Sequence, residues 1–429
     1  MTSDAPQDPS RLAAPPDHAI DVVARLERAG YEAYFVGGCV RDRLLGRTVG
    51  DWDVTTSAHP DKVVALFPRV IPTGIQHGTV TVLSGSEHVE VTTYRVELGY
   101  TDGRRPTGVE FSPHLALDLE RRDFTMNAMA WNPGRGAFVD LHGGVDDLAA
   151  RRIRAVGDPL ARFREDGLRS LRALRFASVL QLDVEAETLA AMGPTREVFR
   201  RVSAERVQVE LFKLLLGPAA SVGVTLLAET GLLEDTLPGF SAGLTVHERA
   251  RVSSALGRAP RDLVVRLAVL LSARGAAALG APLDDLDRLK ASIQMRAQVR
   301  GALAAMAMPP LAPDATDADV RRRCAAIGRA HFEAFAQAAE AVDERASLRL
   351  VQRARDIAAL ESPLTVKDLA LDGRAVQALL GVPPSRRIGA LLEALLDHVL
   401  EAPERNTPEA LRDALPELDR RLPVTGPTT

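Results

Sequence analysis

The stretch that decides the fold runs from Tyr34 to Asp53 and reads YFVGGCVRDRLLGRTVGDWD. Its first residues are aromatic or β-branched, which favours a strand. Gly37 and Gly38 then permit a positive φ and a close approach of the backbone to a ligand. Free N–H groups at such a turn, opening into a helix, form a site for an anion. We therefore expect a strand, a glycine turn, a short helix and a second strand, with Asp51, Trp52 and Asp53 closing the stretch.

Two carboxylates, Asp51 and Asp53, are spaced so that a strand would place them on one face, about 6–7 Å apart. They repel each other unless a cation lies between them, and oxygen ligands of this kind select Mg²⁺. A solitary Gly-Gly is usually a turn, and a solitary Asp-x-Asp usually lies on the surface. A phosphate-binding turn followed closely by such a pair predicts nucleotidyl transfer.

A second polar stretch, residues 118–131, reads DLERRDFTMNAMAW. The Arg122 guanidinium can bind a triphosphate, and Asp123 and Asn127 can form hydrogen bonds with ribose hydroxyls. This composition suggests a nucleotide-binding segment.

A third stretch, residues 163–177, reads FREDGLRSLRALRFA and predicts one helix with its leucines toward a core. Asp166 and Arg169 are three residues apart and would share a helix face, which Arg172 continues. In an arbitrary helix this pattern is a surface ion pair that adds almost nothing to stability.

Glu90 lies in a predicted strand, residues 89–94, which follows another at 79–83. A carboxylate there would act as a third catalytic carboxylate, binding the metal or orienting its water. Alternatively, it lies on the solvated face of an edge strand.

The segment 99–106 reads GYTDGRRP and has no apolar periodicity, so we expect a mobile loop. Its Asp102, Arg104 and Arg105 would reach a bound nucleotide and close over it. The alternative is a merely solvated loop.

Three stretches together resemble one family. Residues 37–53 resemble motif A of the nucleotidyltransferases that include the bacterial class II CCA-adding enzymes and the poly(A) polymerases. Residues 121–128 resemble motif B, and residues 165–172 resemble motif D. The resemblance implies that Asp51 and Asp53 hold two Mg²⁺ ions. It further implies that the triphosphate is bound by Gly37, Gly38 and Arg41, that the ribose is selected by Arg122, Asp123 and Asn127, and that the base is read by Asp166 and Arg169, with Arg172 beside them.

Within that family, residues 74–79, GIQHGT, are similar to the CCA-adding type. The implied activity is template-independent addition of C, C and A to a tRNA 3′ end from CTP and ATP, with release of pyrophosphate. The alternatives are a poly(A) polymerase, a CC-only or A-only relative, or a degenerate RNA-binding module. A degenerate module tends to lose one of the two carboxylates, and this chain has both.

The expected fold class is α+β, a small mixed β-sheet nucleotidyltransferase head followed by an all-helical neck, body and tail. The boundaries that we expect are a disordered N-terminus over 1–17, the head over 18–150, the neck over 151–225, the body over 226–320 and a tRNA-binding tail over 321–422. In the body, residues 270–275 read LLSARG where relatives often carry the metal-binding LLHDIG. Ser272 and Ala273 cannot hold that metal, so we expect no phosphohydrolase activity.

The chain has 429 residues and a net charge of −4, which argues against a uniformly basic coat for nucleic acid. Residues 151–213 nevertheless hold thirteen Arg or Lys against nine Asp or Glu, which suits a phosphate backbone. The two cysteines have no metal-binding spacing, and no apolar run reaches the length of a membrane span. These features predict a cytoplasmic protein without a membrane segment. The family resemblance implies tRNA, CTP and ATP as partners, and no DNA.

Overall fold

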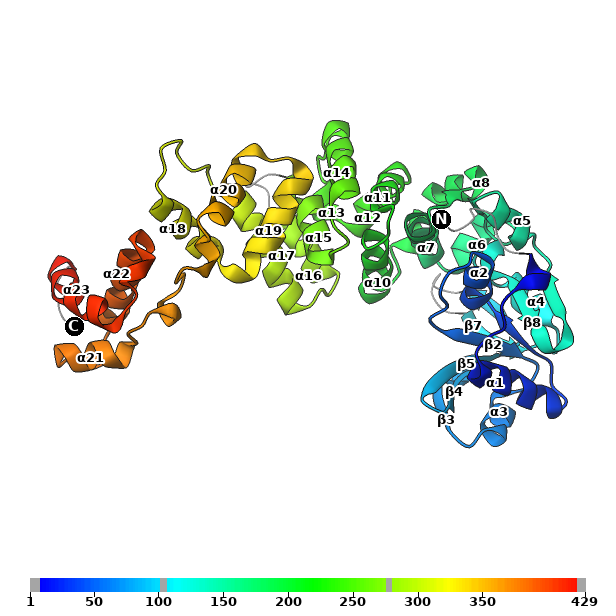
Figure 1. Cartoon of the computed structure of the whole chain (residues 1–429). Helices are drawn as coiled ribbons and strands as arrows, with labels where there is room; N and C mark the ends of the chain where they lie inside the picture. Colours follow the sequence, from blue (N-terminus) through cyan, green and yellow to red (C-terminus); the bar gives the residue numbers. More distant parts are fainter. Residues whose placement is uncertain (1–7, 101–105, 275–279, 423–429) are drawn as a thin grey trace. The chain divides into compact units, whose positions relative to one another are not determined.

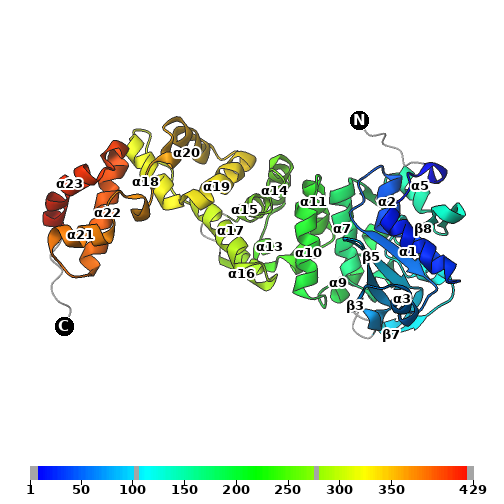
Figure 2. The same cartoon turned by 60° about the horizontal axis from the view of Figure 1, so that its bottom comes forward.

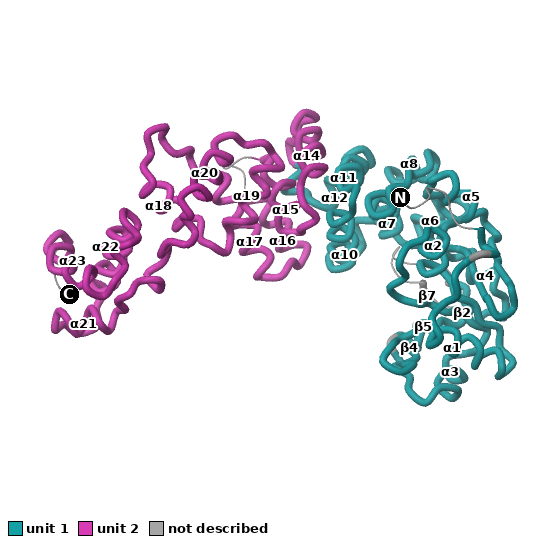
Figure 3. Tube along the Cα trace, in the orientation of Figure 1, with its two compact units in different colours: residues 1–241 teal, residues 242–429 magenta. Residues whose placement is uncertain are grey.

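The computed structural model of the protein describes residues 8–100, 106–274 and 280–422. The chain forms two compact units, residues 1–241 and 242–429 (Figure 3). Their boundary falls inside the predicted body, and the finer division into head, neck, body and tail stays a prediction.

A seven-stranded mixed sheet forms the base of unit 1, with the strand order β3-β4-β5-β2-β1-β8-β9 (Figure 1). Neighbours in this sheet are antiparallel except β2 and β5, which are parallel. The strands are β1 (Ala33–Val36), β2 (Trp52–Thr56), β3 (Val70–Gly74), β4 (Thr79–Ser84), β5 (Glu87–Thr93), β8 (Met129–Asn132) and β9 (Ala137–Asp140). The mixed sheet followed by helices confirms the predicted fold class.

Both faces of this sheet are covered. Helices α1 (Asp17–Arg28) and α3 (Pro60–Leu66) lie over one face, as Figure 2 shows. On the other face Tyr34, Tyr94 and Leu119 belong to one buried cluster, to which α4 (Leu115–Glu120) contributes Leu119. Since side chains alternate along a strand, the central strand β2 carries polar residues toward the α4 side.

The remaining elements of the sheet region connect these layers. Helix α2 (Gly38–Leu44) contacts β1, β2 and β8, and α5 (Gly144–Ala149) follows β9. Strands β6 (Arg95–Tyr100) and β7 (Pro106–Phe111) pair as an antiparallel hairpin. The prediction of a loop over 99–106 is therefore wrong at both ends, because cross-strand pairing includes Tyr100 and Pro106.

Unit 1 continues as short helices, with α7 packed against α10 and α11. They are α6 (Pro159–Glu165), α7 (Leu168–Leu180), α8 (Ala186–Ala190), α9 (Arg196–Phe199), α10 (Ala204–Leu215), α11 (Ala220–Glu229), α12 (Leu232–Thr236) and α13 (Pro238–Ser241). Two short parallel strands, β10 (Arg152–Ile153) and β11 (Asp183–Val184), lie among them. A pair of two-residue strands thus interrupts the otherwise helical neck, because β11 pairs with the segment that leaves the sheet.

The single helix predicted over 163–177 is two helices, α6 and α7, separated at Asp166 and Gly167. Asp166 has extended backbone angles, φ −142° and ψ 106°. A Cβ atom on Gly167 would lie 2.5 Å from the backbone nitrogen of Phe199, far inside van der Waals contact. The break therefore lies where the backbone of α9 passes directly against the chain.

The N-terminal segment differs from the disorder predicted over 1–17. Residues 9–11 form a 3-10 helix, and the carbonyl of Ala14 accepts a hydrogen bond of 2.7 Å from Arg43 Nη2. Pro15 is buried, and α1 already begins at Asp17. Tertiary contacts thus order a segment whose composition is typical of disorder. Residues 1–7 lie outside the described residues.

Unit 2 is helical over the residues that the structure describes. Its helices are α14 (Val246–Arg258), α15 (Leu263–Ser272), α16 (Gly280–Arg288), α17 (Ile293–Met306), α18 (Asp317–Ile327), α19 (Arg329–Val342), α20 (Arg345–Asp356), α21 (Gly373–Leu380), α22 (Arg386–Glu401) and α23 (Pro408–Arg421). The 3-10 helices among the described residues are η1 (Pro9–Arg11), η2 (Ile75–His77), η3 (Thr125–Asn127), η4 (Pro133–Arg135), η5 (Gly193–Thr195), η7 (Ala359–Glu361), η8 (Val366–Asp368) and η9 (Pro403–Arg405).

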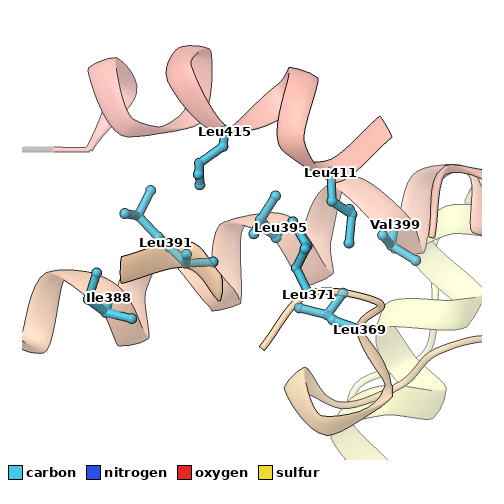
Figure 4. Close-up of a cluster of buried hydrophobic side chains, with 9 residues drawn as sticks. Leu369, Leu371, Ile388, Leu391, Leu395, Val399, Leu411 and Leu415 are labelled. Carbon is cyan, nitrogen blue, oxygen red and sulfur yellow. The ribbon is translucent and has the colours of Figure 1, made fainter. Parts of the chain in front are cut away.

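The C-terminal helices have a core of their own. Figure 4 shows Leu391 and Leu395 of α22 facing Leu411 and Leu415 of α23, with Leu371 beside them. The leucines of α22 recur at helical spacing, which is why the stretch forms one amphipathic helix. Among the described residues, no helix combines the length and the apolar character needed to cross a membrane.

Candidate active site

Three carboxylates gather at the centre of the sheet. Asp53 of β2 is paired in register with Glu90 of β5, and Asp51 is exposed immediately before β2. Burial, together with the charges of Glu90 and Asp51, raises the pKa of Asp53 to about 6, although Arg122 opposes this shift. Strand β5 lies between β4 and β2, so the alternative of Glu90 on an edge strand is wrong.

This cluster fits a divalent cation that shares its coordination with substrate. Like charges close together favour a bound cation, which would relieve the repulsion at Asp53. No group of three or more His, Cys, Asp or Glu among the described residues is arranged to hold a metal. Mg²⁺ is commonly held by one or two carboxylates plus waters and substrate phosphates, which is the donor set that Asp51 and Asp53 offer.

The predicted glycine turn lies between β1 and α2. Gly37 has a φ of 78°, which side chains rarely tolerate, and α2 begins at Gly38. A Cβ atom on Gly37 would lie 3.1 Å from Nη1 of Arg122. The turn and an arginine of the second stretch are therefore in direct contact, as a shared anion site requires.

Hydrogen bonds join the first stretch to the second. Arg41 Nη1 donates to Asn127 Oδ1 at 2.7 Å, and Asn127 Nδ2 donates to Asp123 Oδ1 at 3.0 Å. All three side chains are buried. The predicted triphosphate and ribose residues thus form one connected network.

Arg172 of α7 extends this network. Its Nε and Nη2 lie 2.8 Å and 2.7 Å from Asp123 Oδ2, and its Nη1 lies 3.3 Å from Glu210 of α10. Burial opposes the ionisation of Asp123, but Arg172 outweighs it and holds the pKa of that carboxyl well below its usual range. The ion pair fixes α7 to the second polar stretch, residues 118–131.

The side chains of Asp166 and Arg169 have different partners. Asp166 lies before the start of α7, so the two residues do not share the helix face that we expected. Oδ2 of Asp166 accepts a hydrogen bond of 2.6 Å from Arg206, whereas Arg169 is paired with Glu165. Arg169 Nη2 also donates to the backbone carbonyl of Arg121 at 3.0 Å. Since Arg169 is buried, the alternative of a surface ion pair is wrong as well.

Sequence reasoning missed three acidic residues that support these arginines. Glu165 and Arg169 have an i, i+4 spacing, and Asp118 stands four residues before Arg122, so local spacing would have found both. Glu210 is 38 residues from Arg172 and has no local signal. Asp102, Arg104 and Arg105 lie outside the described residues.

Comparison with known proteins gives two family matches. The family described as "Poly A polymerase head domain" matches residues 33–154, and that described as "Probable RNA and SrmB- binding site of polymerase A" matches residues 181–244. The first match covers the sheet with its carboxylates and glycine turn.

Individual relatives match over different lengths. The CCA-adding enzyme of Lactobacillus helveticus is 37% identical over 413 residues, which cover 94% of this chain and 97% of that protein. The CCA-adding enzyme of Levilactobacillus brevis is 53% identical over 211 residues, 49% of this chain and 53% of that protein. The latter alignment therefore spans about half of each chain.

Solved structures extend the likeness to three dimensions. The CCA-adding enzyme of Bacillus stearothermophilus, in complex with CTP, has a TM-score of 0.78 at 31% identity, covering 95% of this chain and 98% of that chain. The CCA-adding enzyme of Thermotoga maritima, complexed with tRNA, has a TM-score of 0.67 at 20% identity, covering 96% and 97% of the two chains, and shows the fold alone.

Proposed function

This chain belongs to the family of the CCA-adding enzymes, and on that premise we propose that it completes the 3′ end of tRNA. It adds C, C and A from CTP and ATP, releases pyrophosphate and uses no nucleic-acid template. The observation that carries this proposal is the network in unit 1. The Gly37 turn contacts Arg122, Arg122 and Asp123 both bond to Asn127, and Asp123 is paired with Arg172 of α7. The charge of Arg122 also acts on Asp53.

Asp51 and Asp53 would hold two Mg²⁺ ions. The ions, when bound, supply Lewis-acid stabilisation of the phosphoryl oxygens and of the attacking hydroxyl. Glu90, paired with Asp53, keeps the local charge negative and so strengthens the attraction for a cation.

The triphosphate is bound by the backbone N–H groups after Gly37 and by Arg41 and Arg122. Guanidinium groups suit this task because their planar donors match phosphate oxygens and their charge persists at neutral pH. Asp123 and Asn127 hold Arg41 in place and present hydrogen-bonding atoms to the ribose.

Base selection falls to Asp166 and Arg169. An ionised Asp166 accepts hydrogen bonds and Arg169 only donates them, which suits cytosine and adenine, whose amino groups face an acceptor. Uracil and guanine would place a carbonyl oxygen against the carboxylate, and the two acceptors would repel. Arg172, fixed to Asp123, aligns α7 with the nucleotide.

Binding of tRNA is assigned to the basic segment 151–213 and to the helices that follow it, including the predicted tail. The cytoplasm, where tRNA is processed, is the proposed location. Contact of Asp102, Arg104 and Arg105 with the nucleotide remains part of this proposal.

The test is incubation of the full chain with Mg²⁺ and a tRNA that lacks its 3′ CCA, supplied with CTP, ATP, both or neither. We expect two additions with CTP alone and three with both nucleotides. Long homopolymers of A would indicate a poly(A) polymerase, and arrest after CC would indicate a CC-only enzyme. Binding of tRNA without any addition would identify the degenerate RNA-binding module instead.

A further inference from the structure

We propose that Asp118 is a positioning residue for nucleotide binding, because its carboxylate fixes the guanidinium of Arg122 over the Gly37 turn. The inference rests on the proposed function. It assigns a role to a buried carboxylate outside the Asp51 and Asp53 pair.

The Asp118 carboxylate is completely buried, and both of its oxygens are engaged. Oδ1 accepts hydrogen bonds from Nε and Nη2 of Arg121 at 2.9 Å and 2.7 Å. Oδ2 accepts from Arg122 Nη2 at 3.2 Å and from the Thr55 hydroxyl at 3.0 Å. Burial disfavours the charge, but the two arginines outweigh it and hold the pKa of Asp118 below its usual range. Asp118 is therefore a fixed negative charge at neutral pH.

Thr55 sets where this charge lies relative to the site. Thr55 and Asp53 are two residues apart on β2 and so point to the same face, about 6–7 Å apart. The hydrogen bond from Thr55 to Asp118 thus attaches α4 to β2 at the residue that follows Asp53 on the same face of the strand. The charge of Arg122 reaches Asp53 from that position.

Arg122 has few other contacts. Arg122 Nη1 donates to the carbonyl of Asn127 at 3.5 Å, which is a long hydrogen bond. The bond from Arg122 Nη2 to Asp118, at 3.2 Å, is the shorter of the two. Arg122 Nε is buried and donates to no described residue. Without the negative charge of Asp118, the guanidinium is free to leave its position beside Gly37.

Arg121 connects the Asp118 carboxylate to Arg169, one of the two residues proposed to select the base. Asp118 holds the Arg121 side chain, and the backbone carbonyl of Arg121 accepts from Arg169 at 3.0 Å. The bond between Arg169 and Arg121 uses a backbone carbonyl, so the substitution Asp118→Asn should leave it in place. We therefore expect nucleotide affinity to change more than base preference.

The test compares Asp118→Asn with the unchanged protein. Asn keeps the shape but removes the charge, and a hydrogen bond to a charged group contributes about tenfold or more to an equilibrium constant. The dissociation constants of CTP and ATP, measured by calorimetry without tRNA, should each rise about tenfold. The ratio of CTP and ATP use to UTP and GTP use should stay within twofold, which a general loss of packing would not preserve.

A double-mutant cycle with Arg122→Gln tests the route of the effect. If Asp118 acts through Arg122, Asp118→Asn should weaken CTP binding less than twofold when Arg122→Gln is already present. Multiplicative effects of the two substitutions would overturn the proposal, and so would unchanged CTP affinity in Asp118→Asn.

Asp235→Asn is the matched control. Asp235 of α12 is also shared by two arginines, Arg196 and Arg200, at 2.7 Å and 2.8 Å, but neither belongs to the nucleotide network. The CTP affinity of Asp235→Asn should equal that of the unchanged protein.

If Asp118→Asn does not fold, Thr55→Val provides a second variant, because it removes only the hydroxyl donor to Asp118. Its CTP affinity should fall two- to fivefold, and an unchanged affinity would then overturn the proposal. Failure of the unchanged protein to bind CTP would instead refute the proposed function.

Discussion

Asp53 and Glu90 occupy paired positions on the parallel strands β2 and β5, so their carboxylates face the same side of the sheet. Parallel strands are not joined by a short turn, and their pairing brings together residues that are far apart in the chain. The result is a partly buried Asp53 carboxyl whose pKa is raised, first by desolvation and then by the charge of Glu90. The raised pKa of Asp53 should therefore affect both the stability of the protein and its response to Mg²⁺.

Removal of the Asp53 charge should stabilise the metal-free protein at neutral pH. The pKa of Asp53 is raised to about 6 in the folded state, so the folded state binds its proton more tightly than the unfolded state does. The penalty is absent below about pH 4, the usual pKa of Asp, grows between about pH 4 and 6, and is fully present above pH 6. In EDTA at pH 7.5, Asp53→Asn should be more stable by about 1–3 kcal/mol in urea unfolding.

Mg²⁺ provides the second arm of that experiment. It should raise the unfolding midpoint of the unchanged protein at pH 7.5, since a ligand that binds only the folded state stabilises it, and should affect Asp53→Asn much less. Equal responses of the two proteins to Mg²⁺ would argue against a metal at this pair.

Catalysis should depend on both carboxylates of the pair. Asp51→Ala or Asp53→Ala should reduce nucleotide addition by about a thousandfold or more, because several kcal/mol of transition-state stabilisation are lost. Binding of tRNA, measured by gel shift, should persist, since the proposed contacts lie elsewhere. Near-normal turnover in either variant would contradict the assignment.

Base choice should depend on Asp166 and Arg169 even though they have different partners. Asp166→Ala should lose discrimination against UTP and GTP by roughly tenfold to a hundredfold, because the repulsive acceptor is removed. Arg169→Ala should slow the use of both CTP and ATP. Single-nucleotide extension with each triphosphate measures this, and retained preference in both variants would place base selection elsewhere.

Gly167→Ala should destabilise unit 1. The new Cβ would lie 2.5 Å from the backbone nitrogen of Phe199, and overpacking against backbone costs about 1–3 kcal/mol. Gly193→Ala is the control, because nothing lies within 4 Å of its Cβ position. Thermal unfolding of both variants should show a lower midpoint only for Gly167→Ala.

Phosphohydrolase activity should be absent from the full chain. Ser272 ends α15 with its hydroxyl donating to the carbonyl of Val269, and Ala273 follows it, so neither offers a metal ligand of the His-Asp kind. The Asp51→Ala variant, in which transfer is disabled, should not hydrolyse cyclic nucleotides or 2′-phosphates in the presence of divalent metals. Robust hydrolysis would show that another site exists.

Much of this protein was predictable from local pattern. The strand, glycine turn and helix at residues 33–44 follow from a short run of aromatic and β-branched residues and from a glycine with a positive φ. The joining of Arg172 to Asp123 and Asn127 was suggested only by the family resemblance. The break at Gly167 was not anticipated, because the leucine spacing continues across it.

Local spacing and local propensity therefore determined the elements, their order and the chemistry of the carboxylate pair. Only tertiary structure decided which residues meet. It placed Glu90 beside Asp53, gave Asp166 to Arg206 instead of Arg169, and brought Glu210 to Arg172. The physical reason is that buried charges pair with whatever opposite charge lies nearest in space, and that distance depends on how strands and helices pack.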